Sequence, residues 1–340
     1  MVQTEVKAAL AETVAAERSR QSRAYWIRFA LAIAGLILIV IAVNVFTHGY
    51  FLGPRNLITV LRQITYNAIL GVGQTFVIIT AGIDLSIGSL VSLTGVVMAI
   101  LANALHLSGF SLIAVTLVGG IFVGALAGYI NALPVVKLNL PPFITTLAMM
   151  LMARGLSYKI SHGRPVGLNS DAFSNIGIGY IVNTIPISVI WMALIVFVFS
   201  VLLTRMRFGR YVFAIGGNEE ASRLAGINVA RIKTLVYVIS GVCAAVTGFL
   251  LMSRFSSGSP QTGTGYELQA IAAVVVGGTS LMGGRGSIVG TFFGALLIGI
   301  LNNVMNLMGI ESYTQEIVLG AVILVAVILD ELRKRYLRRT

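Results

Sequence analysis

Asp84 is the acidic residue with the most unusual surroundings, because it interrupts an apolar stretch that covers residues 57–101. A carboxylate inside a membrane can relay protons, contact a polar solute or accept hydrogen bonds from unpaired backbone N–H groups. Its segment, AGIDLSIGS, also contains Gly82, Ser86 and Gly88, and glycine favours a break in a helix. We therefore expect one helix to end here and Asp84 to cap the next one. Direct contact between Asp84 and a solute is the alternative.

A second interruption, GGTSLMGGRGS, separates two later apolar stretches. It contains Gly277, Gly278, Gly283 and Gly284, and it carries Arg285 instead of an acid. We expect both interruptions to be helix breaks at an inner gate.

Polar side chains within the apolar stretches are candidates for a solute pathway, because amides can hydrogen bond to hydroxyl groups. The candidates are Asn67, Gln74, Asn302 and Asn303. Hydrogen bonding between helices is the alternative role for these side chains.

Several kinds of chemistry are disfavoured by the motifs that the sequence lacks. It contains no G-x-x-x-x-G-K-[ST] phosphate loop, no H-E-x-x-H motif and no Cys/His cluster. The three histidines fall in separate predicted loops. We therefore predict no catalytic, cofactor-binding or metal-binding residues in this chain, and a membrane enzyme is disfavoured.

Composition indicates the class of protein that must hold these residues. The 340 residues are 57% hydrophobic and 11% charged, and the mean hydropathy is +0.92. Soluble domains carry roughly 25% charged residues, so the sequence predicts an all-α polytopic protein embedded in a lipid bilayer. The net charge of +12 comes from dispersed basic residues, which indicate membrane topology and no nucleic-acid partner.

About ten membrane helices fit the apolar stretches, some of them short or broken. They are predicted at residues 26–46, 57–81, 89–107, 111–132, 143–160, 185–204, 232–253, 268–282, 287–308 and 314–329, and the eighth is short. Basic residues gather on one side of this topology, which the positive-inside rule assigns to the cytoplasm together with both termini. We expect a cytoplasmic tail at residues 1–24, one transmembrane domain at 25–331 and a basic cytoplasmic tail at 332–340.

Two four-residue glycine spacings predict close contact between helices. Gly120, Gly124 and Gly128 lie in the fourth predicted span, and Gly286, Gly290 and Gly294 lie at the ninth. Packing within one chain is the favoured interpretation, and a seam between two copies is the alternative.

The cytoplasmic loop at residues 205–233 contains a predicted short helix. Asn218 is placed to cap it, Glu219 and Glu220 suit the positive end of its dipole, and Gly226 is placed to stop it. A helix of about two turns is too short to be stable alone, so we expect its apolar face to pack on something outside the bilayer. The residues assigned to this helix and its end are Asn218, Glu219, Glu220, Ala221, Ser222, Leu224, Ala225, Gly226 and Ile227.

The stretch GGNEEASRLAGINVARIK resembles the cytoplasmic coupling loop of ABC importer permeases, and the ribose-type sugar permeases in particular. GIDLSIGS, the stretch GGTSLMGGRGSIVGTFFGALLIGILNN and the basic C-terminal tail carry the same resemblance. Ser222 follows Ala221 where the family usually has a second alanine, which exchanges one small residue for another.

The resemblance implies a multi-pass permease subunit of a bacterial inner membrane that imports a monosaccharide of the pentose or hexose type. It implies three partners: an ABC ATP-binding subunit that uses ATP with Mg, an extracytoplasmic sugar-binding protein and a second copy of the permease. The permease itself would be no enzyme and would bind no cofactor. A secondary active transporter of a small polar solute is the alternative, because such carriers also contain broken helices.

Overall fold

The computed structural model describes residues 35, 37–106, 108–168, 170–182 and 184–337. The chain divides into two units, Met1–Asn56 and Leu57–Thr340. The described part of the first unit contains the helix Ile37–Phe46. Within this helix the Asn44 side chain accepts a hydrogen bond from the N–H of Leu52 at 3.2 Å. The predicted tail at residues 1–24 lies outside the described residues.

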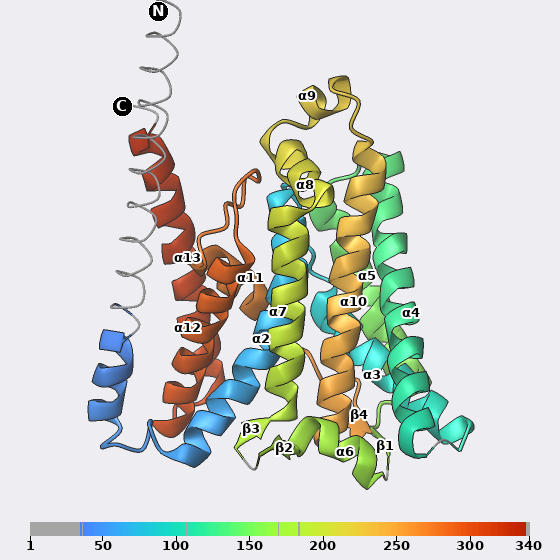
Figure 1. Cartoon of the computed structure of the whole chain (residues 1–340), viewed down its shortest axis with the longest axis vertical. Helices are drawn as coiled ribbons and strands as arrows, with labels where there is room; N and C mark the ends of the chain where they lie inside the picture. The colour runs from blue at the N-terminus through green and yellow to red at the C-terminus, as the bar shows by residue number, and fades with distance from the viewer. Residues whose placement is uncertain (1–34, 36, 107, 169, 183, 338–340) are drawn as a thin grey trace, which may run out of the picture. The chain divides into compact units, whose positions relative to one another are not determined.

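The second unit consists mainly of helices (Figure 1). The first of them, α2 (Pro54–Ile79), begins in the last residues of the first unit. The others are α3 (Ile87–Ala104), α4 (Gly109–Lys137), α5 (Pro142–Ile160), α6 (Asp171–Ile178), α7 (Ile187–Arg205), α8 (Arg207–Gly217), α9 (Glu219–Leu224), α10 (Val229–Phe255), α11 (Tyr266–Val276), α12 (Ile288–Leu307) and α13 (Ser312–Leu337). Among the described residues α3, α4, α7, α10 and α12 are long and apolar enough to cross a membrane. The chain is therefore an all-α polytopic membrane protein.

Only short strands accompany the helices in the described part of the chain. The strand β1 (Val166–Gly167) pairs antiparallel with β4 (Ser257–Gly258), and β2 (Tyr180–Ile181) pairs antiparallel with β3 (Ile185–Pro186). Both pairs lie at the α6 end of the helices, opposite α8 and α9 (Figure 1). The basic residues Lys137 and Arg205 end α4 and α7, at the end that the sequence predicts to be cytoplasmic.

The structure differs from the predicted spans at three places. The eighth span, predicted at 268–282, is the 11-residue helix α11, which at 1.5 Å per residue is about 16 Å long and too short for a hydrocarbon core of about 30 Å. Helices α6 and α8 were not expected, because their apolar runs are shorter than a membrane span. The last helix continues to Leu337, so much of the predicted tail at 332–340 is helical.

The glycine spacings act within the chain, as favoured from the sequence. An added Cβ on Gly124 of α4 would collide with the carbonyl oxygen of Gly241 in α10, and one on Gly294 of α12 would collide with that of Ala273 in α11. These backbones touch only because no side chain separates them. Close packing therefore joins α4 to α10 and α11 to α12.

Candidate functional site

Asp84 is fully buried, with 0% of its surface exposed, in the connection between α2 and α3. Its Oδ1 accepts hydrogen bonds from the N–H of Ser86 at 2.9 Å and from the Ser86 hydroxyl at 2.6 Å. Its Oδ2 accepts one from the Ser240 hydroxyl of α10 at 2.7 Å. The carboxylate therefore ties the break to α10, a contact that the sequence did not indicate.

Two amide side chains complete the network around the break. The Gln74 amide, oriented to satisfy both partners, donates to the carbonyl of Asp84 at 3.2 Å and accepts from its N–H at 3.1 Å. Asn131 of α4 donates to the Ser86 hydroxyl at 2.9 Å. The network joins α2, α4 and α10 to the break before α3, and the side chain of Gln74, a pathway candidate, hydrogen bonds to the backbone of that break.

The predicted cap differs in detail from the observed one. Asp84 accepts from the N–H of Ser86, the residue before α3, and Ser86 makes no side-chain cap of its own. Gly82 lies in the break with Asp84 and Ser86, but Gly88 lies inside the first turn of α3. There an added Cβ would strike the Glu267 carboxylate, so Gly88 serves close packing.

Replacing Asp84 with alanine is expected to lower stability more than replacing Ser240 with alanine. The first change leaves three buried donors unsatisfied, at about 1–3 kcal/mol each, whereas the second removes a single donor. Thermal unfolding of both purified variants in detergent measures the difference. Equal melting temperatures for the two variants would contradict this account of the network.

The second break lies against the first. The N–H of Gly284 donates to the carbonyl of Ile79, the last residue of α2, at 2.9 Å. Gly278, Gly283 and Gly284 have φ angles of +86°, +82° and +71°, which favour glycine strongly over other residues. Gly277 directly follows α11, so all four candidate glycines lie in the connection between α11 and α12.

The predicted short helix is α9, and its local structure follows the sequence. The Asn218 side chain caps it by accepting from the N–H of Ala221 at 2.9 Å. Gly226 has a φ of +81°, and the N–H of Ile227 donates to the carbonyl of Ser222 at 3.1 Å. The helix thus ends through the left-handed glycine that the spacing predicted.

Charged side chains fix α9 to the helix that follows it. Glu219 pairs with Lys233 of α10 at 2.5 Å and with Arg223 of α9 at 3.4 Å. Glu220, Ala221 and Ala225 are exposed, and Leu224 is 83% exposed, whereas Ser222 is buried. The apolar face of α9 is therefore uncovered by the described part of its own chain.

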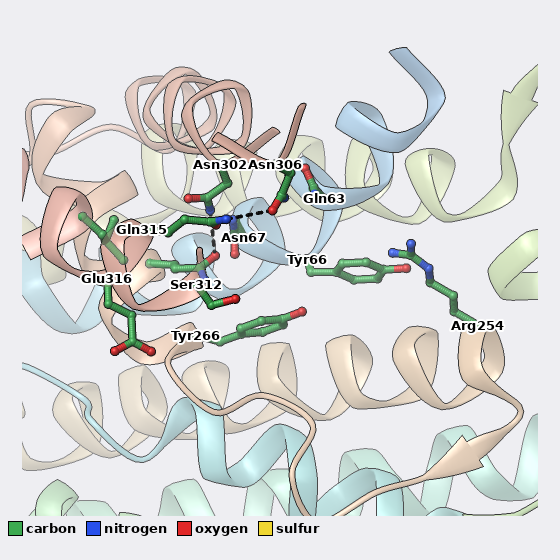
Figure 2. A pocket seen from close by; sticks show the side chains of 12 residues that line it. Gln63, Tyr66, Asn67, Arg254, Tyr266, Asn302, Asn306, Ser312, Gln315 and Glu316 are labelled. Atoms are coloured by element: carbon green, nitrogen blue, oxygen red, sulfur yellow. Dashed lines mark hydrogen bonds between the residues drawn. The ribbon is translucent and has the colours of Figure 1, made fainter. Parts of the chain in front are cut away.

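A polar cavity of about 290 Å3 lies between α2 and the ends of α10, α11, α12 and α13, and Figure 2 shows its lining side chains. This volume is at the lower end of the range of roughly 300–1,000 Å3 for small-molecule sites. The lining contains six amide side chains, two tyrosines, a serine, an arginine, a glutamate and a leucine. They are Gln63, Tyr66, Asn67, Arg254, Tyr266, Gln269, Asn302, Asn306, Ser312, Gln315, Glu316 and Leu319.

The cavity side chains leave hydrogen-bonding capacity facing the open space. Gln315 donates to Asn306 at 2.9 Å and Asn302 donates to Gln269 at 3.4 Å, so each amide keeps further donor or acceptor positions. The Arg254 guanidinium lies 5.8 Å from the centre of the Tyr66 ring, and Figure 2 shows the two side chains next to each other. Such a lining can bind a small neutral solute that carries several hydroxyl groups.

Of the pathway candidates, Asn67 and Asn302 line this cavity, whereas Gln74 and Asn303 do not. Gln63 and Tyr66 of α2 also line the cavity and were not predicted from the sequence. Gln63 lies three residues before Tyr66 and four before Asn67, spacings that bring residues together on one side of a helix. Arg254 and Tyr266, which line the cavity as well, were not predicted either. Polar residues at helical spacing within an apolar stretch were the signal for the α2 residues.

Residues 56–327 match the protein family described as "Branched-chain amino acid transport system / permease component". The ribose import permease protein of Haemophilus influenzae is 45% identical over 299 residues, 86% of this chain and 90% of that protein. The ribose import permease protein of Bacillus subtilis is 44% identical over 298 residues, 87% of this chain and 90% of that protein. The D-allose transport system permease protein of Escherichia coli is 36% identical over 297 residues, with coverage of 87% and 90%. No solved structure matches the chain significantly.

Proposed function

Because this chain belongs to the family of membrane permease components that includes the ribose import permeases, we propose that it forms the membrane pathway of an ATP-driven monosaccharide importer. As a permease component it is not itself an enzyme, and ATP hydrolysis lies in a separate subunit. The proposed sugar is a pentose or hexose. The relatives are permeases for ribose and allose, and this similarity supports the proposed sugar class.

The amide-rich cavity supports the proposed substrate class. In a chain that is 57% hydrophobic, six amides and two tyrosines gather in one small space. Amides donate and accept at once, as a sugar hydroxyl does, and tyrosine offers an apolar ring beside a polar hydroxyl. The lining charges are one arginine and one glutamate, a balance that suits a neutral solute.

We propose that α9 is the coupling helix that binds the ATP-binding subunit. Its exposed Leu224 supplies an apolar side chain for a pocket of that subunit, and the Glu219–Lys233 ion pair fixes the base of the helix. ATP with Mg would bind to the partner, so this chain would carry no cofactor.

Replacing Leu224 with aspartate is expected to weaken binding of the ATP-binding subunit. Loss of a buried anchor side chain typically costs about 2 kcal/mol or more, which is about a thirtyfold rise in the dissociation constant. Co-purification of the tagged permease with its ATP-binding subunit measures the effect. Leu224→Met keeps an apolar side chain of similar volume and should retain binding; equal retention by both variants would contradict docking through Leu224.

The remaining parts of the proposal follow from the family. A binding protein outside the membrane would deliver the sugar to the α6 end, and two copies of the permease would form the pathway in a bacterial inner membrane. ATP-driven closure of the ATPase pair would move α9 and favour one conformation of the membrane helices through differential contacts. The cavity would then open to one side of the membrane at a time.

Co-expression tests the proposed assembly. A tagged copy of the chain should co-purify with an ATP-binding subunit and with an untagged second copy. A permease that is recovered alone from cells that produce the ATP-binding subunit would contradict the proposal and favour a secondary carrier.

A further inference from the structure

The end of α8 touches both helix breaks through a glycine. An added Cβ on Gly216 would lie 2.5 Å from the amide nitrogen of Gly284 and closer still to the carbonyl oxygen of Ile79. Both distances are under 3.0 Å, so the neighbouring backbone atoms would have to shift to make room for a side chain. The α8 backbone is therefore in direct contact with the end of α2 and with the connection between α11 and α12.

Further contacts hold these three segments together. The Gly284 N–H donates to the carbonyl of Ile79 at 2.9 Å, which links the two breaks. Phe208 of α8 packs on the fully buried Phe76 of α2, with the ring centres 5.8 Å apart. Since a peptide backbone cannot swing aside as a side chain can, displacement of α8 must displace its neighbours or break these contacts.

Asn218 alone connects α8, which ends at Gly217, to α9, which begins at Glu219. Asn218 donates its N–H to the carbonyl of Ala214 in α8 at 3.0 Å, and its side chain caps α9. The C-terminal end of α8 and the start of α9 are therefore linked directly through Asn218.

We propose that the contact of Gly216 with Ile79 and Gly284 makes the end of α8, the end of α2 and the α11–α12 connection move as one body. A movement of the coupling helix α9 would then displace both helix breaks. Gly216 is a positioning residue in this scheme, because it acts through backbone contact and touches no solute. The inference rests on the proposed function, in which α9 binds the ATP-binding subunit.

The neighbouring Gly217 provides a matched control. It is exposed, and no atom lies within 4 Å of an added Cβ. Neither glycine has a positive φ angle, so alanine is conformationally acceptable at both positions. Gly216→Ala and Gly217→Ala therefore differ only in whether the new methyl group meets the two breaks.

The experiment compares sugar uptake per ATP hydrolysed for the two variants in the complete transporter reconstituted in proteoliposomes. For Gly216→Ala, assembly and ATP hydrolysis should persist while uptake per ATP falls at least about fivefold, the lower end of typical coupling effects. Gly217→Ala should match the wild type. Unchanged coupling in Gly216→Ala would overturn the inference, whereas a wild-type complex without ATP-dependent uptake would instead contradict the proposed function.

A second experiment covers the case in which Gly216→Ala does not fold. Gly217→Cys and Met282→Cys place two exposed thiols on α8 and on the α11–α12 connection, and the natural Cys243 is 1% exposed. A short bifunctional maleimide should join them without loss of ATP-dependent uptake, because the two segments move together. Abolished uptake after cross-linking would show that they slide past each other and would overturn the inference.

Discussion

Replacing Gly226 with valine is expected to remove most ATP-dependent uptake while the protein stays in the membrane. Gly226 ends α9 with a φ of +81°, and a β-branched residue held there costs about 1–3 kcal/mol. The turn between α9 and α10 would change, and with it the position of Glu219 against Lys233. ATP hydrolysis and sugar uptake, measured together in proteoliposomes, should show hydrolysis without matching transport.

Gly226→Asn is the matched control for this change. Asparagine tolerates the left-handed backbone better than other non-glycine residues, and no atom lies within 4 Å of an added Cβ. The asparagine variant should therefore retain most transport. Normal coupling in the valine variant, or equal losses in both variants, would contradict the importance of the α9 turn.

Replacing Asn67 and Asn302 with leucine is the change expected to have the largest effect on sugar passage. Both side chains line the cavity, and leucine is similar in size but forms no hydrogen bonds. A hydrogen bond contributes about 1 kcal/mol, so each change should lower the rate of sugar uptake about fivefold and the pair about thirtyfold. Radiolabelled sugar uptake by the complete transporter provides the measurement.

Asn103→Leu makes the same substitution away from the cavity. Asn103 lies exposed near the end of α3 and donates to the carbonyl of Gly167 at 2.9 Å. This control should transport normally. Wild-type uptake by the Asn67/Asn302 double variant would show that the cavity is not on the sugar's path.

Local signals in the sequence predicted the parts of the structure that depend on neighbouring residues. Asn218 and Gly226 define α9 through capping chemistry that operates within a few residues. Gly82 and Asp84 marked the first break, and the four glycines from Gly277 to Gly284 marked the second. Apolar length predicted α3, α4, α7, α10 and α12, the described helices that are long and apolar enough to cross a membrane.

Contacts between distant segments could not be read in the same way. Ser240 lies 156 residues from Asp84 along the chain, and nothing in its apolar surroundings indicates a partner. Lys233 could form an ion pair with any of several acidic residues. It pairs with Glu219 because α9 and α10 lie next to each other in the fold. Gly216 had no distinguishing sequence feature, because its importance arises from the backbones of Ile79 and Gly284.

The most direct test of the central claim is sugar uptake into proteoliposomes that contain this chain, its ATP-binding subunit and its binding protein. Uptake should require all three proteins and hydrolysable ATP, and it should stop when the ATP-binding subunit is inactivated while the proton gradient is kept. Uptake by this chain alone, driven by an ion gradient, would contradict the account.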